Sequence, residues 1–291
     1  MMRNYFNTNK VLATGILTVA TVTIFFACKK DDKVSSEKND AQTLAAAQVN
    51  AEAAALYDDA FQLTVNTSYS ESDLNRNSRL AGAGAAKETD MCASLSITPV
   101  ELGVWPKTVT LDFGTSGCTF EGRTRKGKLV FTLNKFLFAS GGTASLTFEN
   151  YSVNDIKIEG TQTITNTTTS EGFGYTYSVA GGKVTYPSGK AYTYTTNRKI
   201  SQTDGSATLL DLGDDVYSLE GTANLSTDSI QATFNVQEPL VKKADCLYLS
   251  KGILAVTVNG YKGNINYGDN VCDDKATLTV GDKSKEITLT R

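Results

Sequence analysis

Histidine is absent from the 291-residue chain, and proline is scarce, with four residues. The missing imidazole excludes the commonest general base, the commonest metal ligand and every nucleophile that histidine activates. A formal net charge of −3 offers no basic surface for nucleic acid. With so few prolines, long stretches of backbone remain free to pair as strands. We therefore expect neither a histidine-dependent enzyme nor a nucleic-acid-binding protein.

Metal and enzymatic chemistry have few remaining candidates. Without histidine, and with oxidised cysteines, only a cation with oxygen ligands such as Ca²⁺ could bind. Asp269, Asp273 and Asp274 share one loop and Asp214-Asp215 lie in another, but neither loop has the spacing of an EF-hand. No carboxylate pair stands out for glycoside hydrolysis, and no glycine-rich phosphate loop is present. The expectation is a non-catalytic protein without metal or cofactor.

The N-terminus has the organisation of an export signal. Arg3 and Lys10 precede the uncharged, apolar stretch 11–27, which ends in alanine. The end of this stretch and Cys28 resemble a lipobox, in which the thiol of the first mature residue receives a diacylglyceryl group. We expect residues 1–27 to be a cleaved signal peptide and acylated Cys28 to hold the chain on a lipid bilayer, because two or more acyl chains bind firmly. The alternative is an uncleaved helical anchor.

The charged segment after Cys28 suggests an address. Lys30, Asp31 and Asp32 resemble the short Lys-acid-acid signal that sends lipoproteins of Bacteroidota to the outer face of the outer membrane. A charge run is also typical of a solvated tether, and the two interpretations are compatible. We expect residues 28–39 to be a tether and the protein to lie at the cell surface, with the periplasmic face of the outer membrane as the alternative.

Beyond the tether the sequence changes character. Apolar residues recur at spacings of three and four in residues 40–67, which predicts a helix with one buried face: Ala45, Val49, Ala53, Leu56, Ala60 and Leu63. Residues 68–90 show no periodicity and are expected to be a loop or linker. From 91 to 291, short alternating runs rich in β-branched and aromatic residues predict strands. The expected fold is mainly β, an antiparallel sheet, sandwich or open barrel, with one N-terminal helix packed on or beside it.

Two segments of the β-rich region resemble each other. Residues 110–118 and 264–272 each contain an apolar residue, Asp or Asn, an aromatic residue, Gly, three further residues and Cys. The functional interpretation would make Asp112 a catalytic or metal-binding carboxylate. The second copy has Asn266 at that place, and asparagine cannot act as a base, whereas both side chains can form the hydrogen bond of a turn. We therefore interpret the motif as architectural.

The cysteines follow the same repeat. With Cys28 acylated, four cysteines remain, and four allow three connectivities. The cysteine that ends each motif lies 26 residues after another, which predicts the pairs Cys92–Cys118 and Cys246–Cys272 and two related halves of the β-rich region. The rival pairing, 92 with 272 and 118 with 246, would join the two ends of that region. Disulfides agree with an exported chain.

Together these features resemble an uncharacterised family of Bacteroidota lipoproteins. Its members have an acidic helical stretch after the lipid cysteine, an Asp-Phe-Gly-x-x-Gly-Cys segment, a Gly-x-x-Arg-x-Gly segment and a Cys-Asp pair near the C-terminus. Here these fall at residues 112–118, at 122–127 with Arg125, and at 272–273. The resemblance covers most of the mature chain. It implies the address and the fold, but no activity, substrate or site.

Aromatic residues supply the one candidate ligand surface. Phe173, Tyr175 and Tyr177 alternate along one expected strand, and Tyr192 and Tyr194 along another. Side chains at i and i+2 share a sheet face, so these rows could form a platform for sugar rings or stabilise the sheet by cross-strand pairing. The preferred function is a membrane-anchored, non-catalytic binding or structural surface, whose partner could be a glycan or another envelope protein. The alternative is a carbohydrate-binding or carbohydrate-active surface component, with a glycan as its partner.

Overall fold

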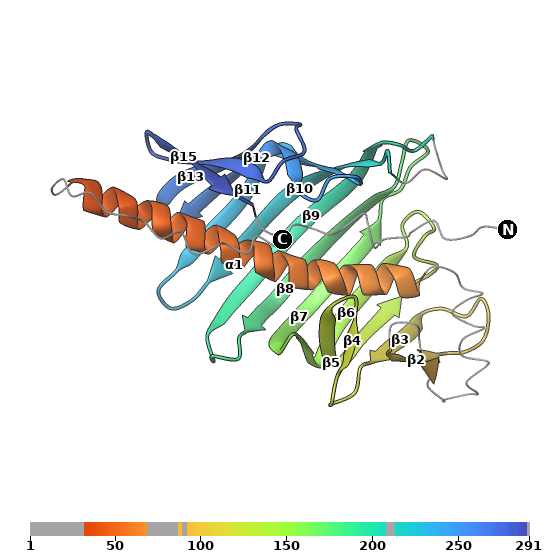
Figure 1. The fold of residues 1–291 in the computed structure, drawn as a ribbon. Helices are drawn as coiled ribbons and strands as arrows, with labels where there is room; N and C mark the ends of the chain where they lie inside the picture. Colours follow the sequence, from red (N-terminus) through yellow and green to blue (C-terminus); the bar gives the residue numbers. More distant parts are fainter. Residues whose placement is uncertain (1–31, 69–86, 89–91, 208–212, 290–291) are drawn as a thin grey trace. The chain divides into compact units, whose positions relative to one another are not determined.

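The computed structural model describes residues 32–68, 87–88, 92–207 and 213–289 (Figure 1). In these residues one helix precedes fifteen strands. The helix is α1 (Asp32–Thr67), and the strands are β1 (Lys87–Glu88), β2 (Ser94–Thr98), β3 (Lys107–Asp112), β4 (Cys118–Phe120), β5 (Arg123–Leu133), β6 (Thr143–Val153), β7 (Ile156–Asn166), β8 (Gly174–Thr185), β9 (Ala191–Asp204), β10 (Val216–Ser226), β11 (Gln231–Lys243), β12 (Leu249–Val258), β13 (Tyr261–Asp269), β14 (Lys275–Val280) and β15 (Lys283–Thr288).

The strands follow one another through the sheet in the order of the sequence. The order runs β1-β2-β3-β5-β6-β7-β8-β9-β10-β11-β12-β13-β14-β15, and β4 pairs with β5 beside this path. Neighbours are antiparallel, and across the described strands the sheet is open, with β1 and β15 at its edges. The prediction of a mainly β, antiparallel fold with one N-terminal helix is confirmed.

Short turns explain this simple topology, because antiparallel neighbours can be joined by two residues. Asn154 and Asp155 connect β6 to β7 with φ values of 50° and 63°. Asn259 and Gly260 connect β12 to β13 with φ values of 49° and 88°. Positive φ at both central residues matches the twist of the flanking strands, and Asn, Asp and Gly are the residues that tolerate it. Local sequence therefore dictates these hairpins.

The chain divides into two compact units. The central unit comprises Leu56–Asn197, and the terminal unit combines the residues up to Ala55 with those from Arg198 onward. The boundary passes through α1 and β9, so each unit contains part of the helix and part of the sheet. Each unit also contains one copy of the repeated motif.

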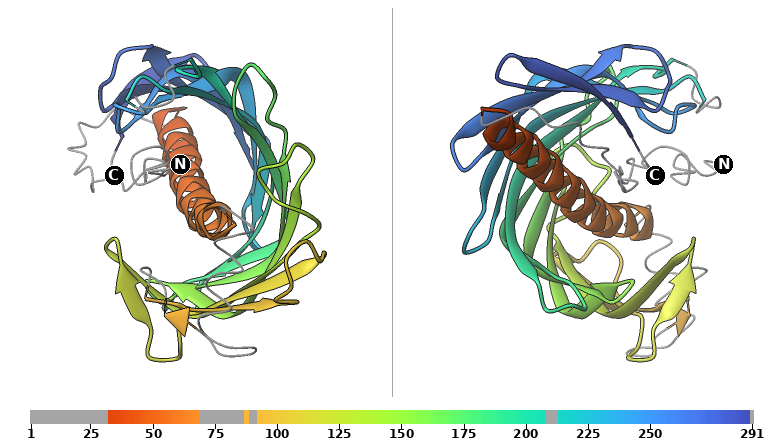
Figure 2. Two further views of the ribbon diagram at one scale, coloured as in Figure 1. Left: turned by 90° about the vertical axis from the view of Figure 1, so that its right-hand side faces the viewer. Right: turned by 60° about the vertical axis from the view of Figure 1, so that its left-hand side comes forward.

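In the central unit, the last turns of α1 pack on the aromatic rows of the sheet (Figures 1 and 2). The ring of Tyr57 stacks on that of Tyr194 in β9, with 5.4 Å between the centroids. The ring centroid of Phe61 lies 5.5 Å from the ring centroids of both Tyr175 and Tyr177 in β8. Each aromatic pair contributes roughly 0.5–1.5 kcal/mol beyond the burial of its area. These contacts fix the helix to one face of the central unit's strands.

In the terminal unit, small residues allow the first part of α1 to approach the sheet. A Cβ atom added to Gly263 in β13 would lie 3.3 Å from Cγ2 of Thr43 and 2.9 Å from the carbonyl oxygen of Thr279. Thr43, Ala46 and Ala47 are all buried. A larger side chain at Gly263 would push against both the helix and the neighbouring strand, so the glycine sets this close approach.

The helix differs from its prediction in two respects. It begins at Asp32, inside the segment expected to be a tether, because no glycine or proline interrupts residues 32–39 and the alanine-rich helix can propagate through them. Its buried face is also displaced in the first half, where Ala45 is exposed and Val49 is only half-buried. Alanine provides little hydrophobic contrast between faces, so the spacing of apolar residues could not select the buried one.

Candidate functional site

Most of the residues expected to anchor and address the protein lie outside the part of the chain that the structure describes. Cys28, Lys30 and Asp31 lie outside the described residues, and Asp32 is the first residue of α1. Lipid attachment and surface export therefore stay predictions. Within the described part of the chain, no helix combines the length and the apolar character needed to cross a membrane.

The aromatic rows form core and not a ligand platform. Tyr175, Tyr177, Tyr192 and Tyr194 are between 0% and 5% exposed. The platform hypothesis is wrong for these four tyrosines, because packed protein covers their rings and a sugar could not stack on them. Phe173, in the loop before β8, is the one member of the set that is only half-buried. Alternation correctly placed the tyrosines on one face but could not tell what covers that face.

The predicted disulfides are confirmed. Cys92–Cys118 has a Cα–Cα distance of 6.0 Å, and Cys246–Cys272 has one of 5.6 Å. In both units the bridge joins a cysteine just before one strand to a cysteine that follows the next, antiparallel strand. In the central unit these strands are β2 and β3, and Cys118 is the first residue of β4; in the terminal unit they are β12 and β13. The bridges therefore close equivalent hairpins at their open ends.

The Asp or Asn of each motif forms the same turn. Oδ1 of Asp112 accepts a hydrogen bond from the backbone N–H of Gly114, and Oδ1 of Asn266 accepts one from Gly268, both at 2.9 Å. The hydrogen bond from Gly114, together with Lys128, holds the pKa of Asp112 below its ordinary value. Because only an acceptor oxygen is needed, aspartate and asparagine serve equally well. This geometry matches the architectural interpretation of the motif.

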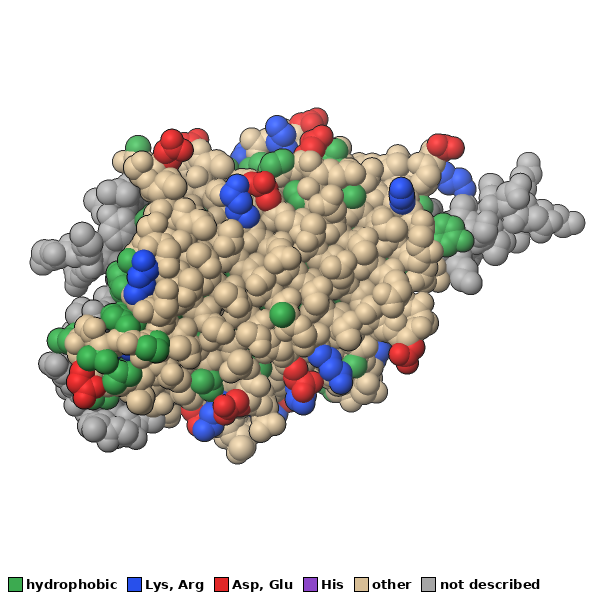
Figure 3. All heavy atoms as spheres, turned by 180° about the vertical axis from the view of Figure 1, so that it is seen from behind, with side chains coloured by type: hydrophobic (Ala, Val, Ile, Leu, Met, Phe, Trp, Pro, Cys, Tyr) green, Lys and Arg blue, Asp and Glu red, His purple; other side chains and the backbone are tan. Residues whose placement is uncertain are grey.

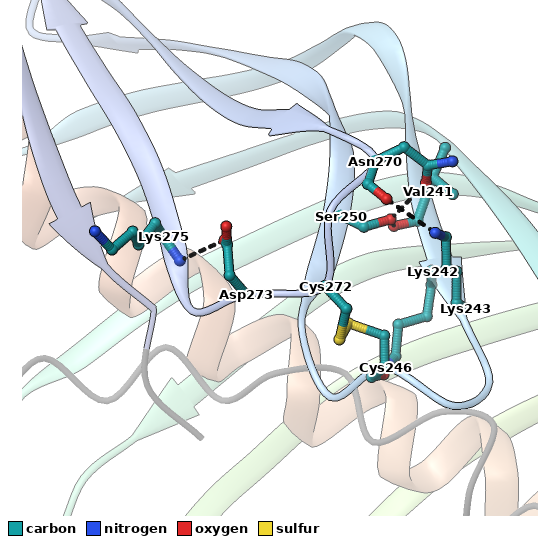
Figure 4. Close-up of a disulfide and its surroundings, with 9 residues drawn as sticks. All are labelled: Val241, Lys242, Lys243, Cys246, Ser250, Asn270, Cys272, Asp273 and Lys275. Atoms are coloured by element: carbon teal, nitrogen blue, oxygen red, sulfur yellow. Dashed lines mark hydrogen bonds between the residues drawn. A yellow bond between two sulfur atoms is a disulfide. The ribbon is translucent and has the colours of Figure 1, made fainter.

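Lysines tie the loops around the second disulfide (Figure 4). Nζ of Lys242, which is 2% exposed, donates a hydrogen bond to the carbonyl oxygen of Cys246, and burial lowers the pKa of Lys242 to about 8. Nζ of Lys243 donates to the carbonyl oxygen of Asn270 at 2.9 Å. Ser250 Oγ donates to Oδ1 of the same asparagine at 2.9 Å. The polar groups here hold backbone in place.

In the described part of the central unit, Asp59 of α1 forms an ion cluster with Arg123 and Arg125 of β5. The carboxylate of Asp59, with a side chain 6% exposed, receives Nε of Arg125 at 2.9 Å and Nη2 of Arg125 at 2.6 Å. Nη1 of Arg123 approaches the same carboxylate at 2.5 Å. The remaining nitrogen of Arg125, Nη1, donates to the carbonyl oxygen of Phe120 at 3.1 Å. Paired, two-point contact of this kind is the strong form of a charged hydrogen bond.

The electrostatics of the cluster keep Arg125 protonated. Burial alone would lower the pKa of Arg125, but the hydrogen bonds and charge of Asp59 raise it above its ordinary value. The adjacent Tyr151 is neutral, because burial, reinforced by the charge of Asp59, raises its pKa well above the ordinary value. Every nitrogen of the Arg125 guanidinium and both oxygens of Asp59 already have partners. The cluster can therefore fix the helix, but it offers no free group for acid–base chemistry.

Neighbouring residues extend these contacts along the helix, and we call Tyr57, Asp58 and Asp59 with their partners the helix clamp. The hydroxyl of Tyr177 donates a hydrogen bond to Oδ1 of Asp58. Tyr57 donates its hydroxyl proton to the carbonyl oxygen of Glu159 at 2.7 Å, and Nε2 of Gln162 donates to the carbonyl oxygen of Tyr57 at 3.2 Å. Three consecutive helical residues thus bind strands β5, β7 and β8.

The sequence contained two signals of this clamp that were not connected. Asp58 and Asp59 are adjacent acids in an otherwise apolar stretch, and Arg125 is the arginine of the Gly-x-x-Arg-x-Gly segment. Buried acids need partners. Nothing in the spacing, however, connects residues 66 positions apart in the chain.

Metal binding has no geometric support in the described part of the chain, where no group of three or more Cys, Asp or Glu side chains converges. No protein-family model matches the chain, and no curated protein or solved structure matches it.

Proposed function

We propose that the chain is an outer-membrane lipoprotein, held by acyl chains on Cys28, that presents a non-catalytic, β-rich surface to another component of the envelope. The observation that carries the proposal is the use of cysteine. Four of the five cysteines form the two disulfides, which is typical of an oxidising, exported compartment. The fifth, Cys28, directly follows the apolar stretch of an export signal.

The helix supports this arrangement mechanically. α1 begins only a few positions after Cys28 and continues for 36 residues, about 54 Å at 1.5 Å per residue. Its last turns are bound to the central unit by the Asp59–Arg125 pair and by the aromatic contacts of Tyr57 and Phe61. We infer that α1 is a stiff link that transmits the position of the anchor to the sheet.

A protein partner fits the chemistry better than a glycan. The tyrosine rows that would stack on sugars belong to the core. The charged cluster and the Asx turns use their polar groups internally. A non-catalytic role requires only a stable, exposed scaffold, which two disulfides and a clamped helix provide.

The anchor is tested by labelling cells with a palmitate analogue. Wild-type protein should carry the label and sediment with membranes. Cys28→Ser should carry none, and should appear as a released protein or an unprocessed precursor. Cys246→Ser is the matched control, because it removes a cysteine without touching the lipobox and should still be labelled. A wild-type protein without label would refute the anchor.

Surface display is tested by adding protease to intact cells. The wild-type protein should be degraded. Replacing Lys30, Asp31 and Asp32 by alanine should protect it until the outer membrane is permeabilised. Protection of the wild type in intact cells would instead place it on the periplasmic face.

A further inference from the structure

Three loops of the central unit meet at the same end of its strands. β3 and β5 pair through Lys107 and Leu133, and β6 and β7 pair through Thr143 and Thr165. The antiparallel register therefore brings the loops that flank these residues together: 99–106, 134–142 and 167–173. A hydrogen bond connects the second loop to the end of β7, since Asn166, the last residue of that strand, donates its side-chain amide to the carbonyl oxygen of Leu137 at 2.9 Å.

These loops carry large apolar side chains toward solvent. We call the set the apolar rim: Leu102, Val104, Trp105, Phe136, Phe138 and Phe173. Leu102 is 51% exposed and Val104 is 45% exposed, whereas the four aromatic residues are half-buried. Among the described residues five large hydrophobic side chains are strongly exposed, and two of them belong to this one short loop. Figure 3 shows hydrophobic side chains gathered at its lower left, where the β2–β3 end of the sheet lies.

A buried lysine holds the most exposed loop in shape. Lys107 is fully buried, and its Nζ donates hydrogen bonds to the carbonyl oxygens of Pro99 at 3.1 Å and Glu101 at 2.6 Å. The same nitrogen lies 5.5 Å from the centre of the Trp105 ring. Burying an ammonium group is costly unless it is well paired. The lysine thus fixes both ends of the turn that presents Leu102 and Val104, so the exposure is built into the loop.

We propose that the apolar rim inserts into the interfacial region of a lipid bilayer; the proposal rests on the proposed function for placing a bilayer beside the protein. Tryptophan and exposed aliphatic side chains favour the boundary between headgroups and acyl chains. A stable protein interface needs at least about 1,000 Å² of complementary area, which two protruding side chains and the edges of four rings do not supply. A bilayer needs no matching pocket, and an anchored chain meets it at high effective concentration.

The single tryptophan makes the proposal directly measurable, because Trp105 is part of the rim. The mature chain from residue 28, with Cys28→Ser to remove the acyl chains, is mixed with vesicles of phosphatidylethanolamine and phosphatidylglycerol. Trp105 emission should shift to the blue and be quenched by lipids brominated near the headgroup. The double variant Leu102→Ser, Val104→Ser should partition about tenfold more weakly, as expected from losing two exposed aliphatic side chains that insertion would partly remove from water.

Tyr261→Ser is the matched control, because Tyr261 is 50% exposed but lies at the start of β13 in the terminal unit. It should leave partitioning unchanged. Equal partitioning of the wild type and the double variant, or no quenching of Trp105, would overturn the proposal. A blue shift that depends on protein concentration without vesicles would overturn it in favour of a second copy of the chain.

The outcome is independent of the anchor. If Cys28 is labelled but Trp105 is not quenched, the proposal for the apolar rim fails and the lipoprotein proposal stands. If Trp105 is quenched but Cys28 is never labelled, the lipoprotein proposal fails and the proposal for the apolar rim stands.

Discussion

Removing Asp59 from its buried pair should destabilise the central unit severely. The side chains of Arg125 and Asp59 are 2% and 6% exposed, so Asp59→Ala leaves a buried guanidinium without its carboxylate partner. Breaking a buried ion pair in this way typically costs about 3–5 kcal/mol. Arg123 is 28% exposed and can turn toward water, so Arg123→Ala should cost only about 1 kcal/mol.

The double variant separates the ion pair from simple loss of contacts. Asp59→Leu together with Arg125→Met replaces both charges by apolar side chains of similar size, which is often close to neutral in other proteins. The double variant should therefore be more stable than the sum of the two single changes predicts, with a coupling free energy of about 2–3 kcal/mol.

Urea unfolding followed by Trp105 fluorescence is the assay, because the only tryptophan lies in the central unit. Asp155→Asn is the control, because asparagine tolerates the positive φ of residue 155 while removing its charge. Its ion pair with Lys126 has an equally short distance, 2.7 Å, but the Asp155 side chain is 65% exposed, so the loss should be about 0.5 kcal/mol or less. A loss below about 1 kcal/mol for Asp59→Ala, or strictly additive single variants, would show that the pair does not hold the helix.

Three further outcomes follow from the structure. Burial raises the pKa of Tyr267 to about 12, so its neutral hydroxyl contributes stability that is complete below pH 10 and is lost as the pH rises from 10 to 12, up to about 3 kcal/mol. Tyr267→Phe should make the fall in stability over that range smaller, but not abolish it, in a pH series of urea titrations, because burial also raises the pKa of Tyr151. Cys246→Ser should cost the terminal unit about 2–5 kcal/mol, seen in circular dichroism melts, while the Trp105 transition of the central unit stays in place; a joint shift would contradict independent unfolding of the two units. Gly127→Ala should cost about 1–3 kcal/mol more than Gly189→Ala. Both glycines have positive φ, but only at Gly127 would a Cβ meet backbone, the carbonyl oxygen of Asn150 at 2.2 Å. Equal losses of stability in urea would refute this crowding.

Several features of the fold follow from the local sequence. Strands follow from alternating β-branched and aromatic residues, and hairpins such as Asn259-Gly260 follow from residues that tolerate positive φ. The disulfide pairs follow from the equal spacing of Cys92–Cys118 and Cys246–Cys272. All of these are local patterns, or patterns that occur twice in one sequence.

The candidate site was less predictable, because its parts are distant in the chain. The aromatic rows were found, but Tyr175 and Tyr194 become core only because Phe61 and Tyr57 of α1 cover them. Alternation defines a face and says nothing of what lies against it. The start of α1 at Asp32 was missed because a charged segment without glycine or proline is compatible with either a tether or a helix.

The sequence by itself determined the export signal pattern, the class of fold, the turns and the pairing of cysteines, since each depends on neighbouring residues or on an internal repeat. The tertiary structure alone decided which face of the helix is buried, that Asp59 meets Arg125, and that Leu102 and Val104 protrude beside Trp105. The physical reason is that burial is a property of two surfaces. One chain segment carries the pattern of its own surface, but the partner that removes it from water is set by the path of the whole chain.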